Sequence, residues 1–260
     1  MSKTALITGA SSGIGYELAK LFARDRTNLV LVARDEPKLN QIAAELQSGA
    51  GISVKVVAAD LAKPAAPAEI YRATRNGGII VDYLVNNAGF GVIGPFLDTD
   101  LQSQLDMIQV NAASVVHLTR LYLQDMRAQG SGRVLNLAST AAFQPGPLMC
   151  IYYATKAFVL SFTEAIANEL AGTGITATAL CPGPTATDFQ RRAKMQAVRL
   201  FKTRLLVSMT AQQVAEIGYR GFLAGKVLVI PGLVNKIGVQ SVRFSPRAVV
   251  RQVTRWLQES

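Results

Sequence analysis

The sequence predicts an α/β fold in which helices cover both faces of a doubly wound parallel sheet. Short apolar runs alternate with helix-length amphipathic stretches along the 260 residues, which indicates strands joined by helical crossovers. Hydrophobic residues make up 50% of the chain, and its length is enough to bury a large core in one domain. We find no internal repeat or low-complexity segment, so we expect a single domain.

Seven apolar runs are the expected strands. The intervening stretches are long enough for helices, and the longest of these are residues 100–128 and 151–171. In such a sheet, ligands bind beyond the carboxyl ends of the strands. The strand-like runs are residues 3–8, 28–33, 52–58, 81–86, 133–138, 175–180 and 226–230.

A glycine-rich turn follows the first expected strand. Gly9, Gly13 and Gly15 lead directly into a helical pattern that starts at Tyr16. A strand, a glycine turn and a helix in this order can cradle a phosphate, because the N–H groups and the dipole at a helix start favour an anion. The spacing differs from the common Gly-x-Gly-x2-Gly fingerprint, and a glycine turn alone is often a tight connection. Its place after a buried strand favours nucleotide binding.

Ser139, Tyr152 and Lys156 are the candidate catalytic side chains. If residues 151–171 are helical, Tyr152 and Lys156 lie on one face, one turn apart. A free phenol has a pKa of about 10, and a nearby cation favours the phenolate. We therefore expect Lys156 to lower the pKa of Tyr152. Such a pair also occurs by chance on exposed helices, so its meaning depends on the rest of the chain.

Several motifs together resemble the short-chain dehydrogenase/reductase family, over about residues 3–230. Each motif is modest, and their order and spacing make the joint match specific. The motifs are Thr8 to Gly15, Asp60 and Leu61, Asn86 to Gly89, Asn111, Ser139, Tyr152 with Lys156, and Pro182 to Thr187.

The resemblance implies a Rossmann-type sheet in the order 3-2-1-4-5-6-7 and a catalytic tetrad of Asn111, Ser139, Tyr152 and Lys156. Tyr152 would exchange a proton with the substrate oxygen as hydride moves to or from the cofactor. Ser139 would hold that oxygen by a hydrogen bond. Lys156 would also contact the nicotinamide ribose, and Asn111 would hold a water that connects Lys156 to solvent. Tyr153 is a rival phenol, one residue out of the family's register.

The residue that follows the second expected strand bears on the choice of cofactor. An arginine there favours the extra phosphate of NADP, whereas a carboxylate would bind the ribose 2′-hydroxyl of NAD. Arg34 occupies this position, which favours NADP(H), although Asp35 and Glu36 leave NAD open.

The resemblance also assigns cofactor contacts along the whole chain. Ser11 or Ser12 would join Arg34 at the 2′-phosphate, and Asp60 and Leu61 would flank the adenine. Thr187 would anchor the nicotinamide carboxamide. The full expected set is Gly9, Ser11, Ser12, Gly13, Ile14, Gly15, Arg34, Asp60, Leu61, Asn87, Ala88, Gly89, Tyr152, Lys156, Pro182, Gly183, Thr185 and Thr187.

The expected activity is NADP(H)-dependent interconversion of a hydrophobic carbonyl compound and its secondary alcohol. Residues 90–96 and 143–149, which would wall the site, are uncharged and largely apolar. Substrates of the 3-oxoacyl, steroid-like or retinoid-like class all fit, and the sequence does not rank them. The alternative is a catalytically silent NADP sensor or scaffold of the same fold. Such a protein would be expected to lack tetrad members, and this chain keeps all four.

The entire net charge of +10 lies in the last 73 residues. Residues 1–187 contain 14 Lys/Arg and 14 Asp/Glu, whereas residues 188–260 contain 13 and 3. We expect residues 1–187 to form the dinucleotide-binding and catalytic core. Residues 188–260 would add, within the same domain, a substrate lid and a C-terminal extension. The lid is expected in the basic amphipathic stretch 190–206.

A helix is also expected after Ser245, with that serine as its cap and Pro246 in its first turn. Its cations and its apolar residues would lie on separate stripes. Three explanations compete for the basic region: a solvated face whose apolar side packs on the domain or a sister subunit, an anionic membrane surface, or capture of an anionic apolar substrate. Nucleic acid has no supporting motif. The stripes are Arg247, Arg251 and Arg255, and Val249, Val253 and Trp256.

The remaining signals favour a reduced, cytoplasmic protein without a metal site. Cys150 and Cys181 lack metal-ligand spacing, and we interpret both as small apolar fillers. His117 is interpreted as structural. Residues 1–3 lead into the first strand, so no signal peptide is expected, and no apolar run is long enough to span a bilayer. The resemblance implies a homodimer or homotetramer.

Overall fold

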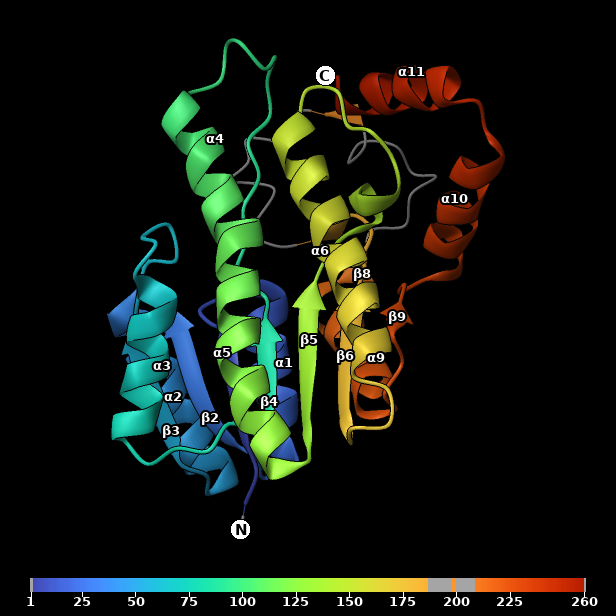
Figure 1. The fold of residues 1–260 in the computed structure, drawn as a ribbon. Helices are drawn as coiled ribbons and strands as arrows, with labels where there is room; N and C mark the ends of the chain where they lie inside the picture. The colour runs from blue at the N-terminus through green and yellow to red at the C-terminus, as the bar shows by residue number, and fades with distance from the viewer. Residues whose placement is uncertain (1, 187–197, 200–208, 260) are drawn as a thin grey trace.

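The computed structural model describes residues 2–186, 198–199 and 209–259. Its main sheet has seven parallel strands in the order β3-β2-β1-β4-β5-β6-β9 (Figure 1), which confirms the predicted fold class and strand order. Each predicted run overlaps one of these strands, although β5 begins one residue earlier than predicted and the last strand is much shorter than predicted. The strands are β1 (Thr4–Thr8), β2 (Asn28–Ala33), β3 (Val54–Ala58), β4 (Tyr83–Asn86), β5 (Gly132–Leu137), β6 (Ile175–Leu180) and β9 (Leu228–Val229).

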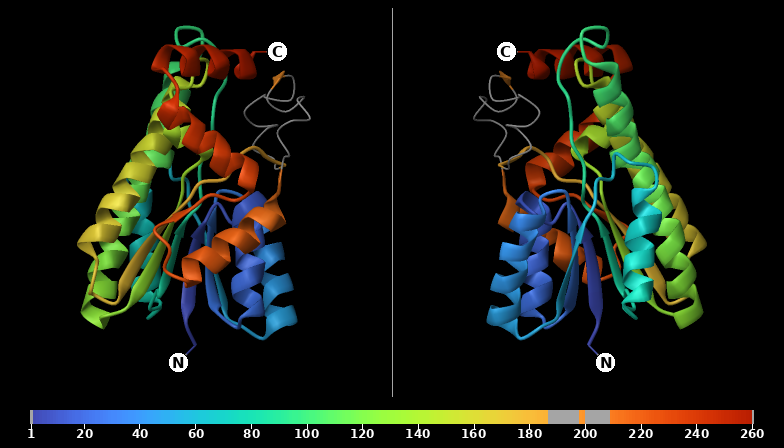
Figure 2. Two further views of the ribbon diagram at one scale, coloured as in Figure 1. Left: turned by 90° about the vertical axis from the view of Figure 1, so that its right-hand side faces the viewer. Right: turned by 90° about the vertical axis from the view of Figure 1, so that its left-hand side faces the viewer.

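Helices cover both faces of this sheet, as the two side views in Figure 2 show. Alternate strand residues point to opposite faces. Accordingly, Ile7 packs in the core cluster formed with α1, α2 and α9, and its neighbour Leu6 packs in the cluster formed with α3 and α5. The helices are α1 (Gly13–Arg24), α2 (Glu36–Ala50), α3 (Ala66–Asn76), α4 (Leu101–Ile108), α5 (Ser114–Gln129), α6 (Cys150–Glu169), α9 (Ala211–Leu223), α10 (Leu233–Phe244) and α11 (Arg247–Gln258).

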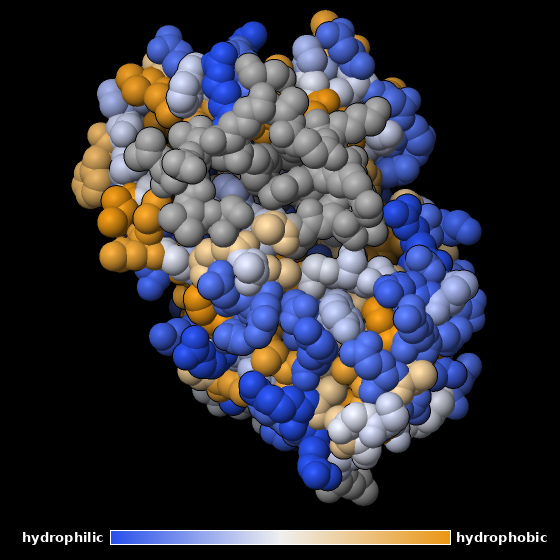
Figure 3. Space-filling view, turned by 180° about the vertical axis from the view of Figure 1, so that it is seen from behind, coloured by the Kyte–Doolittle hydropathy of each residue, from blue (hydrophilic) through white to orange (hydrophobic). Residues whose placement is uncertain are grey.

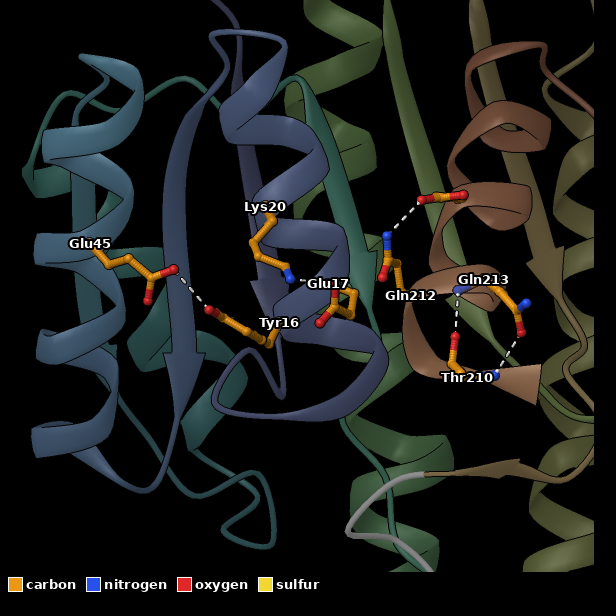
Figure 4. A network of polar contacts seen from close by, with 8 residues as sticks. Tyr16, Glu17, Lys20, Glu45, Thr210, Gln212 and Gln213 are labelled. Carbon is orange, nitrogen blue, oxygen red and sulfur yellow. Dashed lines mark hydrogen bonds and ion pairs between the residues drawn. The ribbon is translucent and has the colours of Figure 1, made fainter. Parts of the chain in front are cut away.

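Polar contacts link α1 to α2 and fix the start of α9 (Figure 4). The Tyr16 hydroxyl donates to Glu45 Oε1 at 2.9 Å and so links α1 to α2. A capping box starts α9, in which the Thr210 hydroxyl accepts from the Gln213 N–H at 3.2 Å and the Gln213 side chain accepts from the Thr210 N–H at 3.0 Å. Thr210 also ends the short strand β8 (Met209–Thr210), which pairs with β7 (Thr185–Ala186). A cap of this kind contributes about 0.5–2 kcal/mol to helix stability.

The long helical stretch that was expected at 100–128 is interrupted. A five-residue π-helix, η1 (Gln109–Ala113), separates α4 from α5. Asn111 lies within it and is 1% exposed. Its Nδ2 donates to the Phe90 carbonyl at 2.9 Å, and its Oδ1 accepts from the Phe90 N–H at 3.1 Å. These two bonds fix the loop that follows β4. Single-turn π-helices are frequent at functional sites.

The chain ends in α10 and α11, which lie beyond the carboxyl ends of the strands (Figure 1). The predicted helix after residue 245 is present, but its predicted serine cap is wrong. The Ser245 hydroxyl donates back to the Ser241 carbonyl at 2.8 Å, and Pro246 occupies the N-cap position of α11 instead of its first turn. Among the described residues, no helix is long and apolar enough to cross a membrane. The expected lid at 190–206 falls almost entirely outside the described residues.

Candidate active site

A cavity of about 660 Å³ opens beyond the carboxyl ends of the strands, where this fold is expected to bind ligands. The structure brings nearly all of the predicted site residues to its wall. Gly15 and Asn111 lie behind the wall, and Thr187 is outside the described residues. The predicted residues that line the cavity are Gly9, Ser11, Ser12, Gly13, Ile14, Arg34, Asp60, Leu61, Asn87, Ala88, Gly89, Ser139, Tyr152, Lys156, Pro182, Gly183 and Thr185.

The glycine turn brings bare backbone to one end of the cavity. Gly9 and Gly13 have φ angles of 66° and 58°, a region that favours glycine. A Cβ on Gly15 would collide with the Gly9 carbonyl. The helix α1 starts at Gly13, its N-cap residue Ser12 makes no side-chain cap bond, and no acidic residue lies in its first turn. The N–H groups at this helix start are therefore available to an anion such as a phosphate.

Asn87 joins the glycine turn to the end of β4. Its Nδ2 donates to the carbonyls of Thr8 and Gly9 at 2.9 and 3.2 Å. The Thr8 hydroxyl in turn accepts from the N–H groups of Asn87 and Ala88, both at 3.0 Å. Four hydrogen bonds thus join the ends of two neighbouring strands at the cradle.

Arg34 and Asp35, which follow β2, differ in whether their side chains are hydrogen-bonded. Asp35 Oδ1 accepts from the Lys38 N–H at 3.0 Å and caps α2. Arg34 is exposed on the cavity wall and makes no hydrogen bond or ion pair with another described residue. One oxygen of the Asp35 carboxylate, which left NAD open in the sequence, is therefore engaged at the helix start, whereas the Arg34 guanidinium is free to contact an anionic group.

Ser139, Tyr152 and Lys156 meet where β5 ends. Ser139 starts the short 3-10 helix η2 (Thr140–Phe143), and its Oγ accepts from the Ala141 N–H at 3.1 Å and shares a hydrogen bond with Tyr152. Lys156 is on α6 one turn after Tyr152. Its Nζ donates to the Leu137 carbonyl at 2.6 Å and lies 5.8 Å from the centroid of the Tyr152 ring. One small polar group in the cavity could contact the serine and tyrosine hydroxyls together.

Burial controls the protonation of this cluster. Removal from water raises the pKa of Tyr152 well above its usual value, and the hydrogen bond with Ser139 lowers it by less. The net shift is upward, contrary to the expectation that Lys156 would lower it. Burial also lowers the pKa of Lys156 to about 8. The lysine lies beside the tyrosine ring and is held by a backbone carbonyl, and desolvation is the largest cause of both pKa shifts.

Asn111 supports the cluster from behind. Its Nδ2 also donates to the Thr155 hydroxyl at 3.2 Å, and that hydroxyl donates to the Tyr152 carbonyl at 2.8 Å. A Cβ added to Gly89 would lie 3.0 Å from Asn111 Oδ1 and 3.5 Å from Lys156 Nζ. Asn111 and Lys156 therefore approach the same point, and a Cβ at Gly89 would press on the Asn111 side chain.

The far end of the cavity contains residues that the sequence analysis missed. Tyr153, a rival phenol to Tyr152 in the sequence, lies on the wall, and its hydroxyl accepts from Gln258 Nε2 at 2.7 Å. Gln258 is 2% exposed and lies on α11. The four-residue spacing of Val250, Thr254 and Gln258 could have revealed this buried face. Apolar residues of α10 and α11 form most of the surrounding wall: Val234, Val239, Val242, Val249, Val250, Val253 and Leu257.

Other predictions have mixed outcomes. Phe90 and Met149, from the two loops that were expected to wall the site, do line the cavity. Cys181 is buried, but Cys150 is exposed, so the filler interpretation is wrong for Cys150. His117 is half-buried on α5 and lies away from the cavity wall.

A parallel α/β sheet with an anion cradle after its first strand and a serine, a tyrosine and a lysine at the end of β5 is typical of dinucleotide-dependent oxidoreductases. The comparison with protein families agrees. The family model described as short chain dehydrogenase matches residues 3–197, and the chain belongs to this family of oxidoreductases.

Individual relatives support the assignment. The chain is 36% identical over 196 residues to a very-long-chain 3-oxoacyl-CoA reductase of Anas platyrhynchos. This alignment covers 73% of this chain and 62% of that protein. A short-chain dehydrogenase from Sphingobium yanoikuyae in complex with NADPH has a TM-score of 0.82 at 32% identity, with 93% of each chain covered. A short chain dehydrogenase/reductase from Burkholderia phymatum in complex with NAD has a TM-score of 0.83 at 25% identity, with 98% of this chain and 95% of that chain covered.

Proposed function

We propose that this chain is an NADP(H)-dependent oxidoreductase that interconverts a hydrophobic carbonyl compound and its secondary alcohol. The observation that carries the proposal is the arrangement within one cavity. Ser139, Tyr152 and Lys156 lie between an uncapped helix start at one end and an apolar wall from α10 and α11 at the other. A cofactor and an apolar substrate could therefore meet at the three polar side chains.

The cofactor is proposed to lie over the carboxyl ends of β1, β2 and β4. The N–H groups at the start of α1 suit its pyrophosphate, and the unpaired Arg34 suits a 2′-phosphate. The capping role of Asp35 supports NADP over NAD, because that carboxylate is already hydrogen-bonded. Relatives in complex with NADPH and with NAD are both known, so the preference rests on Arg34 and Asp35. The bound cofactor supplies or accepts the hydride.

Tyr152 is proposed as the proton donor to the substrate oxygen. Its raised pKa keeps the phenol protonated at neutral pH, which suits an acid in the direction of carbonyl reduction. Ser139 would hold the same oxygen and stabilise its developing negative charge. Lys156 has a pKa of about 8 and is one helical turn away, so it can pass a proton near neutrality. Asn111 keeps the Gly89 loop and α6 in register behind these groups.

The proposed substrates are apolar carbonyl compounds. Side chains of valine and leucine from the last two helices dominate the far wall, and burial of such surface stabilises a bound ligand by about 25 cal/mol for each Å² of apolar area. Similarity to a 3-oxoacyl-CoA reductase makes a 3-oxoacyl compound one member of the class to test. Steroid-like and retinoid-like ketones are the others.

A panel of bulky apolar ketones, with a small sugar as the polar comparison, tests the proposal by the rate of NADPH oxidation. We expect turnover of one or more apolar ketones, little with the sugar, and a higher kcat/KM with NADPH than with NADH. Preference for NADH would overturn the cofactor assignment. Tight binding of NADPH without turnover of any ketone would favour the sensor or scaffold alternative.

A further inference from the structure

The last two helices carry an apolar surface that the cavity does not use. On α10, Leu233, Ile237 and Phe244 are four and seven residues apart and therefore lie on one stripe. They are 72%, 61% and 87% exposed, and none of them lines the cavity. The cavity-lining residues of α10 lie on the other side of the helix. Apolar side chains this exposed and this close together indicate an interaction surface.

Cations border this stripe. Lys236 and Arg243 lie on the adjoining side of α10, and Arg247 and Arg251 continue along α11. All four are exposed, and none forms an ion pair with another described residue. Residues 226–259 contain six Lys/Arg and one acidic residue, Glu259. We call Leu233, Lys236, Ile237, Arg243, Phe244, Arg247 and Arg251 the outer face.

Figure 3 shows apolar side chains gathered along the edge of the molecule where α10 lies, next to strongly hydrophilic ones. The figure and the exposures agree that this apolar surface is open to solvent. An exposed apolar stripe bordered by unpaired cations matches the chemistry of an anionic bilayer surface, where apolar side chains enter the acyl boundary and cations meet the headgroups.

We propose that the outer face docks on an anionic phospholipid bilayer. A second copy of the chain fits less well, because a two-fold contact would bring the cations of both outer faces into one interface, and the outer face contains no acidic residue to pair with them. The opposite side of α10 lines the cavity, so docking would bring the cavity next to the lipid phase. The proposal does not depend on the catalytic roles of Tyr152 or Ser139.

Flotation with vesicles tests the proposal directly. We expect the protein to float with phosphatidylcholine vesicles that contain phosphatidylserine and to stay behind with pure phosphatidylcholine. The double variant Arg243→Gln/Arg247→Gln should bind about thirtyfold more weakly, about fivefold for each lost cation. The double variant Ile237→Ser/Phe244→Ser should also bind more weakly, because it loses the apolar anchor.

A matched control removes the same amount of charge elsewhere. Arg72 on α3 and Arg127 on α5 are exposed, and Arg72→Gln/Arg127→Gln should float like the unmodified protein. Each variant should bind NADPH with unchanged affinity, which shows that it is folded. Binding should also weaken at about 1 M salt, where the screening length falls to about 3 Å.

Three results would overturn the proposal. The first is no flotation with anionic vesicles at low salt. The second is an equal loss of flotation in the control variant, which would mean that net charge alone drives binding. The third is a change of oligomeric mass, measured by light scattering, in Ile237→Ser/Phe244→Ser without a change in flotation, which would assign the outer face to a second copy.

Discussion

Replacement of Lys156 by methionine is expected to stabilise the protein while it removes turnover. Lys156 is 4% exposed, and its ammonium has one described hydrogen-bond partner, the Leu137 carbonyl. Burial lowers its pKa from 10.5 to about 8. Methionine has a similar length and no charge, so it fills the same space without the desolvation penalty.

The size of the effect follows from the pKa shift. A change of about 2.5 units corresponds to about 3 kcal/mol, at about 1.4 kcal/mol for each unit. Below about pH 8 the lysine is charged in the folded and unfolded chains, and the folded chain carries the full penalty. Between about pH 8 and 10.5 the folded chain loses the proton and the unfolded chain keeps it, so the free energy of unfolding of the unmodified protein rises with pH. Loss of the bond to Leu137 offsets about 1–2 kcal/mol of the gain in the variant.

Urea unfolding of both proteins at several pH values, without added cofactor, measures this difference. Lys156→Met should be more stable than the unmodified protein at pH 7, and the difference in free energy of unfolding should shift by about 3 kcal/mol against the variant between pH 8 and 10.5. The difference between the two proteins cancels the titration of other groups. A difference that stays constant over this pH range would refute the depressed pKa. Such a trade of stability for function is common at active sites.

Three further changes test other parts of the site. Arg34→Ala should lower kcat/KM with NADPH by about tenfold to a hundredfold, because a charged hydrogen bond to the 2′-phosphate is lost, and should leave kcat/KM with NADH unchanged. Equal losses with both cofactors would contradict the 2′-phosphate role. Gly15→Ala should destabilise the protein by about 1–3 kcal/mol and weaken NADPH binding, because its Cβ would meet the Gly9 carbonyl. Thermal unfolding measures the loss of stability, and a fluorescence titration measures NADPH binding. A variant unchanged in both would contradict the tight packing of the turn. Tyr153→Phe leaves the buried Gln258 amide without its partner, so it should cost about 1–3 kcal/mol in urea unfolding yet retain turnover, and a loss of turnover would move the proton-donor role to Tyr153.

Much of the site could be predicted because parallel strands end at one edge. Gly9, Arg34 and Ser139 are far apart in the sequence, but each follows an apolar run that becomes a strand, and the structure brings all three to one cavity. For Tyr152 and Lys156 the prediction needs only helix geometry, in which residues four apart lie on the same face. These predictions need the local sequence pattern and the fold class, and they do not need any individual tertiary contact.

What could not be predicted depends on contacts between distant residues. The π-helix around Asn111 forms where that side chain bonds to Phe90, 21 residues earlier. The helical pattern of α11 did not reveal which side faces inward. Trp256 belongs to the predicted apolar stripe, yet it is 51% exposed and does not line the cavity, whereas the polar Gln258 is buried against Tyr153. The upward shift of the Tyr152 pKa likewise follows from burial in the folded chain.

The most direct test of the central claim is Tyr152→Phe, assayed with NADPH and a ketone that the unmodified protein reduces. This change removes one hydroxyl from the cavity and keeps the ring. The variant is expected to bind NADPH with unchanged affinity and to turn over about a hundredfold to ten-thousandfold more slowly, the usual contribution of a positioned acid. Turnover at the unmodified rate, with NADPH bound, would contradict the assignment of Tyr152 as the proton donor.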